Sequence, residues 1–220
     1  MSFMTSDFFE RLRKDSRFRI KVFLCVSFIC NIAYALFLFV IGESYSAKWF
    51  FVISVYYGLL SIVRILVFSQ ISPKKRLVTK IKVIRICGYF LFIINLVFSI
   101  MALVLIQEGK NVDYHEITVI AIATYTFSTL TVAIVNSVRY IKKKDYLHAC
   151  VKLISLVSAS VSILTLTDTM LSTFGEDNAL LKSIILPILS VAVAVLILFC
   201  AVAMIRNANV YLRKLSDEKE

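Results

Sequence analysis

Six long apolar runs constrain this chain more than any other feature of its sequence. A helix of about 20 residues crosses a hydrocarbon core of roughly 30 Å, so an apolar run of that length predicts a transmembrane helix. Of the 220 residues, 60% are hydrophobic, whereas soluble domains have about 45–50%. The sequence therefore predicts an all-α, polytopic transmembrane helix bundle with no separate soluble domain. The predicted spans are about 22–41, 49–69, 86–106, 117–138, 147–168 and 183–204.

Lys and Arg residues are distributed unevenly between the two sides of such a bundle. The N-terminal segment, the second and fourth loops and the C-terminal tail, with their flanks, hold 21 of the 25 Lys and Arg residues. The other three loops hold 3, at Lys48, Lys110 and Lys182, and Arg64 lies inside a span. Because basic loops stay on the cytoplasmic side, we predict a cell (plasma) membrane protein with both termini in the cytoplasm. We expect the basic clusters to contact anionic lipids of the inner leaflet and not nucleic acid.

The two ends of the chain are predicted to lie outside the bilayer. In residues 1–19 the apolar and basic residues fall on opposite helical arcs, and DFFE at 7–10 is an acidic form of the capping box. This pattern favours a short amphipathic helix on the inner leaflet, with a disordered basic leader as the alternative. Residues 20–206 then form the six-helix domain, and residues 207–220 form a cytoplasmic tail.

The sequence lacks the motifs of common membrane enzymes and channels. It contains no GxSxG, no HExxH and no glycine-rich phosphate loop. Asp168, at the end of the fifth run, is the one carboxylate within a predicted span. Since no nucleophile or acid–base pair can be assembled, we expect no catalysis, no metal and no cofactor. The low content of five Gly and two Pro predicts continuous helices, unlike the interrupted spans of many transporters.

Arg64 is the most unusual residue of the second span. It follows Ser54, Tyr57 and Ser61 at a 3-4-3 spacing, which places all four on one helical face. Its guanidinium stays charged and has five donors to satisfy. Arg64 lies about five residues, or 7 Å, from the inner boundary. It therefore either extends to the membrane surface or faces protein and binds a lipid headgroup or another anion. Asp168 is excluded as its counter-ion because it belongs to the outer end of the fifth span.

Other polar residues lie on spans that could pack against this face. Ser and Thr recur at helical spacing in the fifth span, which we predict to be a central packed helix because small hydroxyl residues line helix contacts in membranes. Alternatively, the polar faces of spans two, four and five surround a cavity, with asparagines contributing at the midplane. The candidate ligand or lipid-headgroup residues are then Arg64, Tyr57, Ser61, Asn136, Asn31 and Asn95.

Three stretches resemble an uncharacterised family of small bacterial six-span integral membrane proteins: SAKWFFVISVYYGLLSIVR (46–64), ATYTF (123–127) and LTDTML (166–171). In that family a Ser-x-x-Trp-Phe start precedes a YYxLLSxxR helix. The resemblance implies the same topology but no assigned activity. The residues that it singles out are Trp49, Tyr56, Tyr57, Ser61, Arg64, Tyr125, Thr126, Phe127 and Asp168.

By size and topology the chain is also similar to the substrate-binding membrane subunits of energy-coupling-factor vitamin importers. Those subunits dock to their partner through an Ala-x-x-x-Ala pattern in the first span. Here Ala33 and Ala35 are only two residues apart, so the docking pattern is not reproduced.

Two functions remain open from the sequence. The first is a non-catalytic structural or interaction component of the cell membrane, which contacts anionic lipids and possesses a protein partner or forms a homo-oligomer. The second is a small-solute transporter, or the membrane substrate-binding subunit of one, with a polar cavity lined by spans two, four and five. A polar pocket at mid-depth favours the second, because the first allows those side chains to be fully packed.

Overall fold

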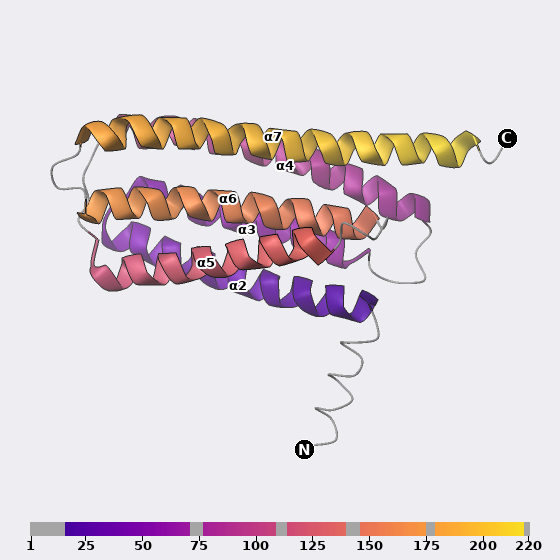
Figure 1. The fold of residues 1–220 in the computed structure, drawn as a ribbon, viewed down its shortest axis with the longest axis horizontal. Coiled ribbons are helices and arrows are strands. Elements are labelled where there is room, and N and C mark those ends of the chain that lie inside the picture. The colour runs from indigo at the N-terminus through magenta and orange to yellow at the C-terminus, as the bar shows by residue number, and fades with distance from the viewer. Residues whose placement is uncertain (1–15, 71–76, 109–113, 140–145, 175–178, 218–220) are drawn as a thin grey trace, which may run out of the picture.

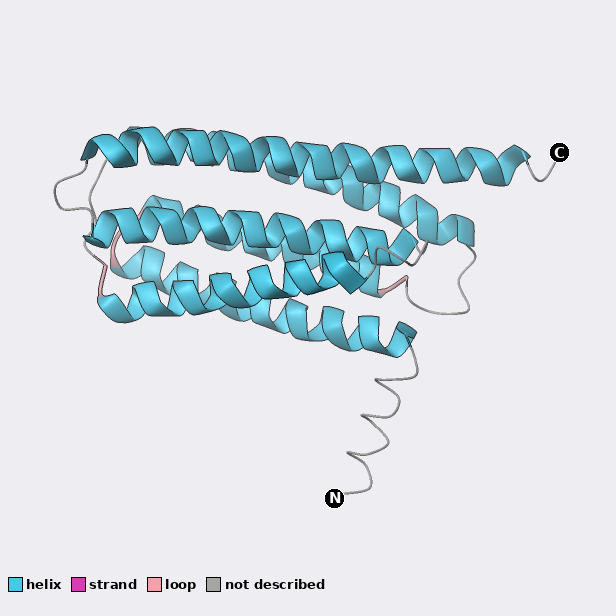
Figure 2. Cartoon of the chain, in the orientation of Figure 1, coloured by secondary structure: helices cyan, strands magenta, loops and turns pink. Residues whose placement is uncertain are grey.

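The computed structural model describes residues 16–70, 77–108, 114–139, 146–174 and 179–217, and it contains six α-helices (Figure 1). Each helix is long and apolar enough to span a membrane, and the described residues include no strand (Figure 2). The predicted all-α bundle of six spans is therefore confirmed. The helices are α2 (Ser16–Ser44), α3 (Lys48–Phe68), α4 (Leu77–Glu108), α5 (Glu116–Arg139), α6 (Tyr146–Phe174) and α7 (Ala179–Asp217).

Two helices are much longer than the apolar runs that predicted them. α4 begins at Leu77, well before residue 86, and α7 continues to Asp217 through most of the predicted tail. With 39 residues, α7 is about 58 Å long, which exceeds a hydrocarbon core of about 30 Å. Pro187 lies inside α7 without ending it. The amphipathic helix predicted for residues 1–19 falls mostly outside the described residues, since α2 begins at Ser16.

α3 and α6 form the centre of the bundle. In the most apolar 18-residue stretch of each helix, the buried share is 56% in α3 and 67% in α6. In the other four helices it is only 22–33%. α2 packs on α3, α5 on α6 and α4 on α7, while α3 and α6 link these pairs to one another. The prediction that the fifth span is a central packed helix is confirmed, because Ser158, Ser162, Thr165 and Thr169 of α6 are at most 1% exposed.

The two ends of the bundle differ in charge. α2 begins and α7 ends at the same end of the bundle (Figure 1). Among the described residues, this end carries Lys82, Arg85, Lys152 and Arg206, and we call it the basic end. The opposite end, where α2 ends and α5 begins, includes Glu43 and Glu116.

Gly88 lets α4 and α7 approach each other closely. A Cβ atom at this position would lie 2.7 Å from Cγ1 of Ile205 and 3.3 Å from the carbonyl oxygen of Ala201. We expect Gly88→Ala to push the helices apart and to lower the free energy of unfolding by about 1–3 kcal/mol. The measurement is the midpoint of unfolding when sodium dodecyl sulfate is titrated into the protein in a mild detergent.

Gly58 of α3 provides the matched control for this prediction. A Cβ atom there would meet nothing within 4 Å. Gly58→Ala should therefore leave stability unchanged or raise it by about 0.5–1 kcal/mol, because alanine favours a helix over glycine. An equal loss in both variants would contradict the close approach of α4 and α7 at Gly88.

Candidate functional site

The polar face predicted for the second span is turned into the protein. Ser54, Tyr57, Ser61 and Arg64 of α3 are all buried. The Ser54 hydroxyl donates to the carbonyl oxygen of Ala35 at 2.8 Å, and the Ser61 hydroxyl donates to that of Tyr57 at 2.9 Å. Backbone acceptors thus satisfy both serines, which leaves Arg64 as the chemically distinctive member of this face.

The guanidinium of Arg64 does not extend to the surface of the bundle. The residue is 4% exposed. Its Nη1 donates to the carbonyl oxygen of Ser27 in α2 at 2.8 Å and also to the Ser27 hydroxyl. Since both bonds come from Nη1, Nη2 and Nε of Arg64 have no hydrogen-bond partner within the described part of the chain.

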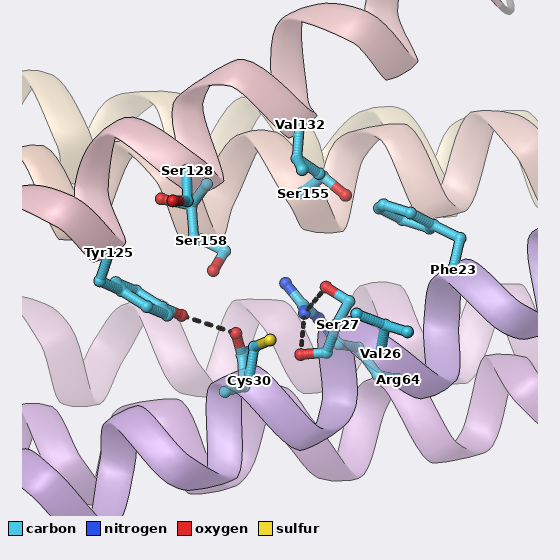
Figure 3. A pocket seen from close by; sticks show the side chains of 12 residues that line it. Phe23, Val26, Ser27, Cys30, Arg64, Tyr125, Ser128, Val132, Ser155 and Ser158 are labelled. Carbon is cyan, nitrogen blue, oxygen red and sulfur yellow. Dashed lines mark hydrogen bonds between the residues drawn. The ribbon is translucent and has the colours of Figure 1, made fainter.

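A cavity of about 220 Å³ lies in front of Arg64, and we call it the Arg64 cavity. Figure 3 shows one terminal nitrogen of Arg64 bonded to Ser27, while the other points into the cavity on the side of Ser158. No carboxylate is found among the described residues that line the cavity, so none of them provides a counter-ion for Arg64. The lining residues are Phe23, Val26, Ser27, Cys30 and Asn31 of α2, Arg64 of α3, Tyr125, Ser128, Thr129 and Val132 of α5, and Ser155 and Ser158 of α6.

Two further buried polar groups at the cavity have no hydrogen-bond partner among the described residues. They are the amide nitrogen Nδ2 of Asn31 and the hydroxyl of Ser158. An unpaired buried polar group costs about 1–3 kcal/mol, so native proteins rarely leave several together. Asn31 and Arg64 can only donate at their unpaired nitrogens, and Ser158 can also donate. The cavity thus presents the free edge of Arg64 to a group that accepts hydrogen bonds, and the unpaired groups of Asn31 and Ser158 lie buried beside it.

Tyr125 lines the cavity at the end that is farther from the basic end, and it belongs to a cluster of three tyrosines. The rings of Tyr34 and Tyr125 stack with centroids 3.6 Å apart, and the ring of Tyr57 packs edge-on against both. The Tyr125 hydroxyl donates to Oδ1 of Asn31 at 2.7 Å, and the Tyr57 hydroxyl donates to the carbonyl oxygen of Ser158 at 3.3 Å. These contacts fix the position of Asn31 and join α2, α3, α5 and α6 around one end of the cavity.

The structure brings some of the predicted site residues together and separates others. Arg64 and Asn31 line the same cavity. Tyr57 and Ser61 lie behind it, where Tyr57 supports Tyr125 and Ser158. Asn95 belongs to α4 and does not line the cavity, and the side chain of Asn136 is outside the described residues.

The first span contributes more to the cavity than the sequence predicted. Spans two, four and five were expected to surround it, but five of its lining residues belong to α2. Ser27, Asn31 and Tyr34 follow a 4-3 spacing that places them on one helical face. The same spacing could have identified Ser27 as a site residue. Its carbonyl oxygen accepts a hydrogen bond from Arg64.

Asp168 does not contribute to this site, and the described residues offer no metal-binding cluster. Asp168 is buried in α6, ten residues after Ser158, which corresponds to about 15 Å along the helix. This distance agrees with the expectation that Asp168 lies too far from Arg64 along the membrane normal to be its counter-ion. No group of three His, Cys, Asp or Glu residues that could hold a metal occurs among the residues that are described.

Comparisons of the chain with protein-family models, with curated proteins and with solved structures find no match. The resemblance to a six-span bacterial family therefore stays a prediction, and the Arg64 cavity is the feature of the molecule that bears on its function.

Proposed function

We propose that this multi-pass membrane protein binds an anionic group in the Arg64 cavity and performs no catalysis of its own. The charge distribution supports a cell-membrane location with the basic end in the cytoplasm, because basic residues are retained on that side. We infer that its role is structural or regulatory, through the bound anion and through contacts with anionic lipids. As far as the chain is described, the cavity lining offers hydroxyl and thiol groups but no histidine or carboxylate to activate them.

The observation that carries the proposal is a buried arginine without a counter-ion at an open cavity. A buried charge without a charged partner is costly, and Ser27 offers Arg64 only neutral oxygens. An oxyanion at the free edge of the guanidinium would neutralise the charge and accept its remaining hydrogen bonds. Asn31 and Ser158 would then complete the coordination of the anion.

A small-solute transporter is the second candidate, and one feature of the cavity favours it. Tyr125, which is packed in the tyrosine cluster, lies at one end of the cavity, while the lining also includes residues exposed at the surface of the bundle. A cavity bounded at one end is what one state of an alternating-access carrier requires. The proposal of anion binding holds for either function, because a carrier must also bind its solute.

The first test is native mass spectrometry of the purified protein in a phosphate-free detergent. We expect the wild type to retain one anionic molecule and Arg64→Ala to lose it, because Arg64 is the only Lys or Arg among the described residues that line the cavity. Arg64→Gln serves as a second variant, since its amide can still donate to Ser27 but carries no charge. It should also lose the anion.

Arg85→Ala is the matched control for the Arg64 variants. Arg85 is another arginine near the basic end, but it belongs to α4 and interacts with Asn209 of α7 at 3.5 Å. Its removal should leave the retained anion in place. Identical bound molecules in the wild type and in all three variants would overturn the proposed anion site.

A further inference from the structure

The size of the Arg64 cavity limits what part of a ligand it can hold. Sites for whole small molecules usually measure about 300–1,000 Å³, whereas this cavity measures about 220 Å³. It can therefore enclose a headgroup-sized anion, and any larger part of the ligand must lie outside it.

The mouth of the cavity lies on the lipid-facing surface of the bundle. Three of the lining residues, Val26 and Cys30 of α2 and Ser128 of α5, are exposed. Their neighbours Ile29 and Phe127 are 59% and 62% exposed, as expected for side chains that contact lipid. The mouth thus opens sideways between α2 and α5, into the apolar part of the membrane.

The depth of the cavity matches the leaflet at the basic end. Arg64 lies four residues, or about 6 Å, before the end of α3 at Phe68. Phe23, at the shallow end of the cavity, comes two residues after Lys21, where the candidate span of α2 begins. A headgroup from this leaflet would need to move only a short distance below the surface to reach Arg64.

The walls of the cavity combine two kinds of surface. Arg64 offers its free nitrogens at the inner end, where the unpaired groups of Asn31 and Ser158 lie buried beside it. Phe23, Val26 and Val132 form apolar walls. A free inorganic anion would leave these walls without a partner from the ligand, while an acyl chain attached to the anion would cover them and continue into the bilayer.

From this geometry we propose that the ligand is an anionic amphiphile from the leaflet at the basic end. Its oxyanion, a phosphate or a carboxylate, binds Arg64, Asn31 and Ser158, and its acyl chain leaves the cavity between α2 and α5. This inference rests on the proposed function, because it names the chemical class of the anion that the Arg64 cavity binds.

The cysteines of α2 allow a direct test. Cys30 lines the cavity, whereas Cys25 is exposed on the same helix without lining it. The full-length protein in dodecyl maltoside is alkylated with N-ethylmaleimide, and the rates at Cys25 and Cys30 are followed by peptide mass spectrometry. The added probes are phosphatidate, oleate, inorganic phosphate and uncharged monoolein.

We expect phosphatidate or oleate to slow the alkylation of Cys30 by about tenfold at a concentration of ten times Kd, because the site is then about nine-tenths filled. The rate at Cys25 should not change, and Arg64→Gln should lose the protection of Cys30. Protection by one of the two amphiphiles alone would identify the oxyanion as phosphate or as carboxylate.

The other outcomes separate this inference from the proposed function. Equal protection by inorganic phosphate would overturn the amphiphile but keep the anion site. Equal protection by monoolein, or protection that persists in Arg64→Gln, would overturn both, because charge would then play no role. Slowing of Cys25 together with Cys30, or no protection by any probe, would also overturn the inference.

Discussion

Replacing Tyr125 with alanine is expected to lower the free energy of unfolding by about 3 kcal/mol, the lower end of the range for losing a packed aromatic ring. The ring stacks on Tyr34 with a centroid distance of 3.6 Å and packs edge-on against Tyr57. Its hydroxyl donates to Asn31 at 2.7 Å. Because packing and interhelical hydrogen bonds drive helix association in membranes, the loss of all these contacts should loosen α5 from α2.

The prediction is measured by titrating the protein in mild detergent with sodium dodecyl sulfate. Phe127→Ala is the matched control, since Phe127 is an aromatic residue of the same helix that is 62% exposed and faces lipid. It should change stability by less than about 0.5 kcal/mol. A loss for Phe127→Ala as large as that for Tyr125→Ala would show that the tyrosine cluster does not hold the helices together.

Tyr125→Phe separates the hydrogen bond from the packing of the ring. The variant keeps the stack on Tyr34 but leaves Oδ1 of Asn31 without its donor. A loss of about 1–3 kcal/mol is expected for an acceptor left unpaired. A loss as large as that of Tyr125→Ala would assign the effect to the hydrogen bond alone.

The helices could be predicted from the sequence because hydrocarbon requires every backbone polar group to be satisfied within the span. Long apolar runs with few glycines and prolines leave the α-helix as the simplest solution, and all six runs are helical. The ends of α4 and α7 could not be predicted in the same way. They continue past the apolar runs, where the sequence becomes polar and hydropathy no longer marks a helix.

Parts of the candidate site were also accessible from the sequence. The spacing of Ser54, Tyr57, Ser61 and Arg64 correctly placed these residues on a buried face. Asn31 could be singled out because an amide in an apolar span needs partners. The spacing could not show which spans lie next to each other, since most faces of a membrane helix are apolar whether they contact lipid or protein. For that reason Asn95 could not be separated from the cavity, although α4 packs mainly on α7.

Arg64→Met is expected to be at least as stable as the wild type without ligand, and less stable than the wild type with ligand. Without ligand, the variant should be as stable as the wild type or more stable by up to about 3 kcal/mol, because it removes a buried charge at a similar side-chain volume. The apolar walls of Phe23, Val26 and Val132 can accept a thioether. The carbonyl oxygen of Ser27 remains within α2, so it does not depend on Arg64 alone.

With ligand, the wild type should gain stability that the methionine variant does not gain. At a ligand concentration of about 100 times Kd, binding raises the free energy of unfolding by about 2.7 kcal/mol. The measurement is the unfolding midpoint of both proteins in dodecyl maltoside, with and without oleate or phosphatidate. If Arg64 is a structural residue that Ser27 already satisfies, the variant should be the less stable protein under both conditions. If the wild type becomes the more stable protein only when ligand is added, then Arg64 is retained for binding, at a cost to the stability of the empty protein.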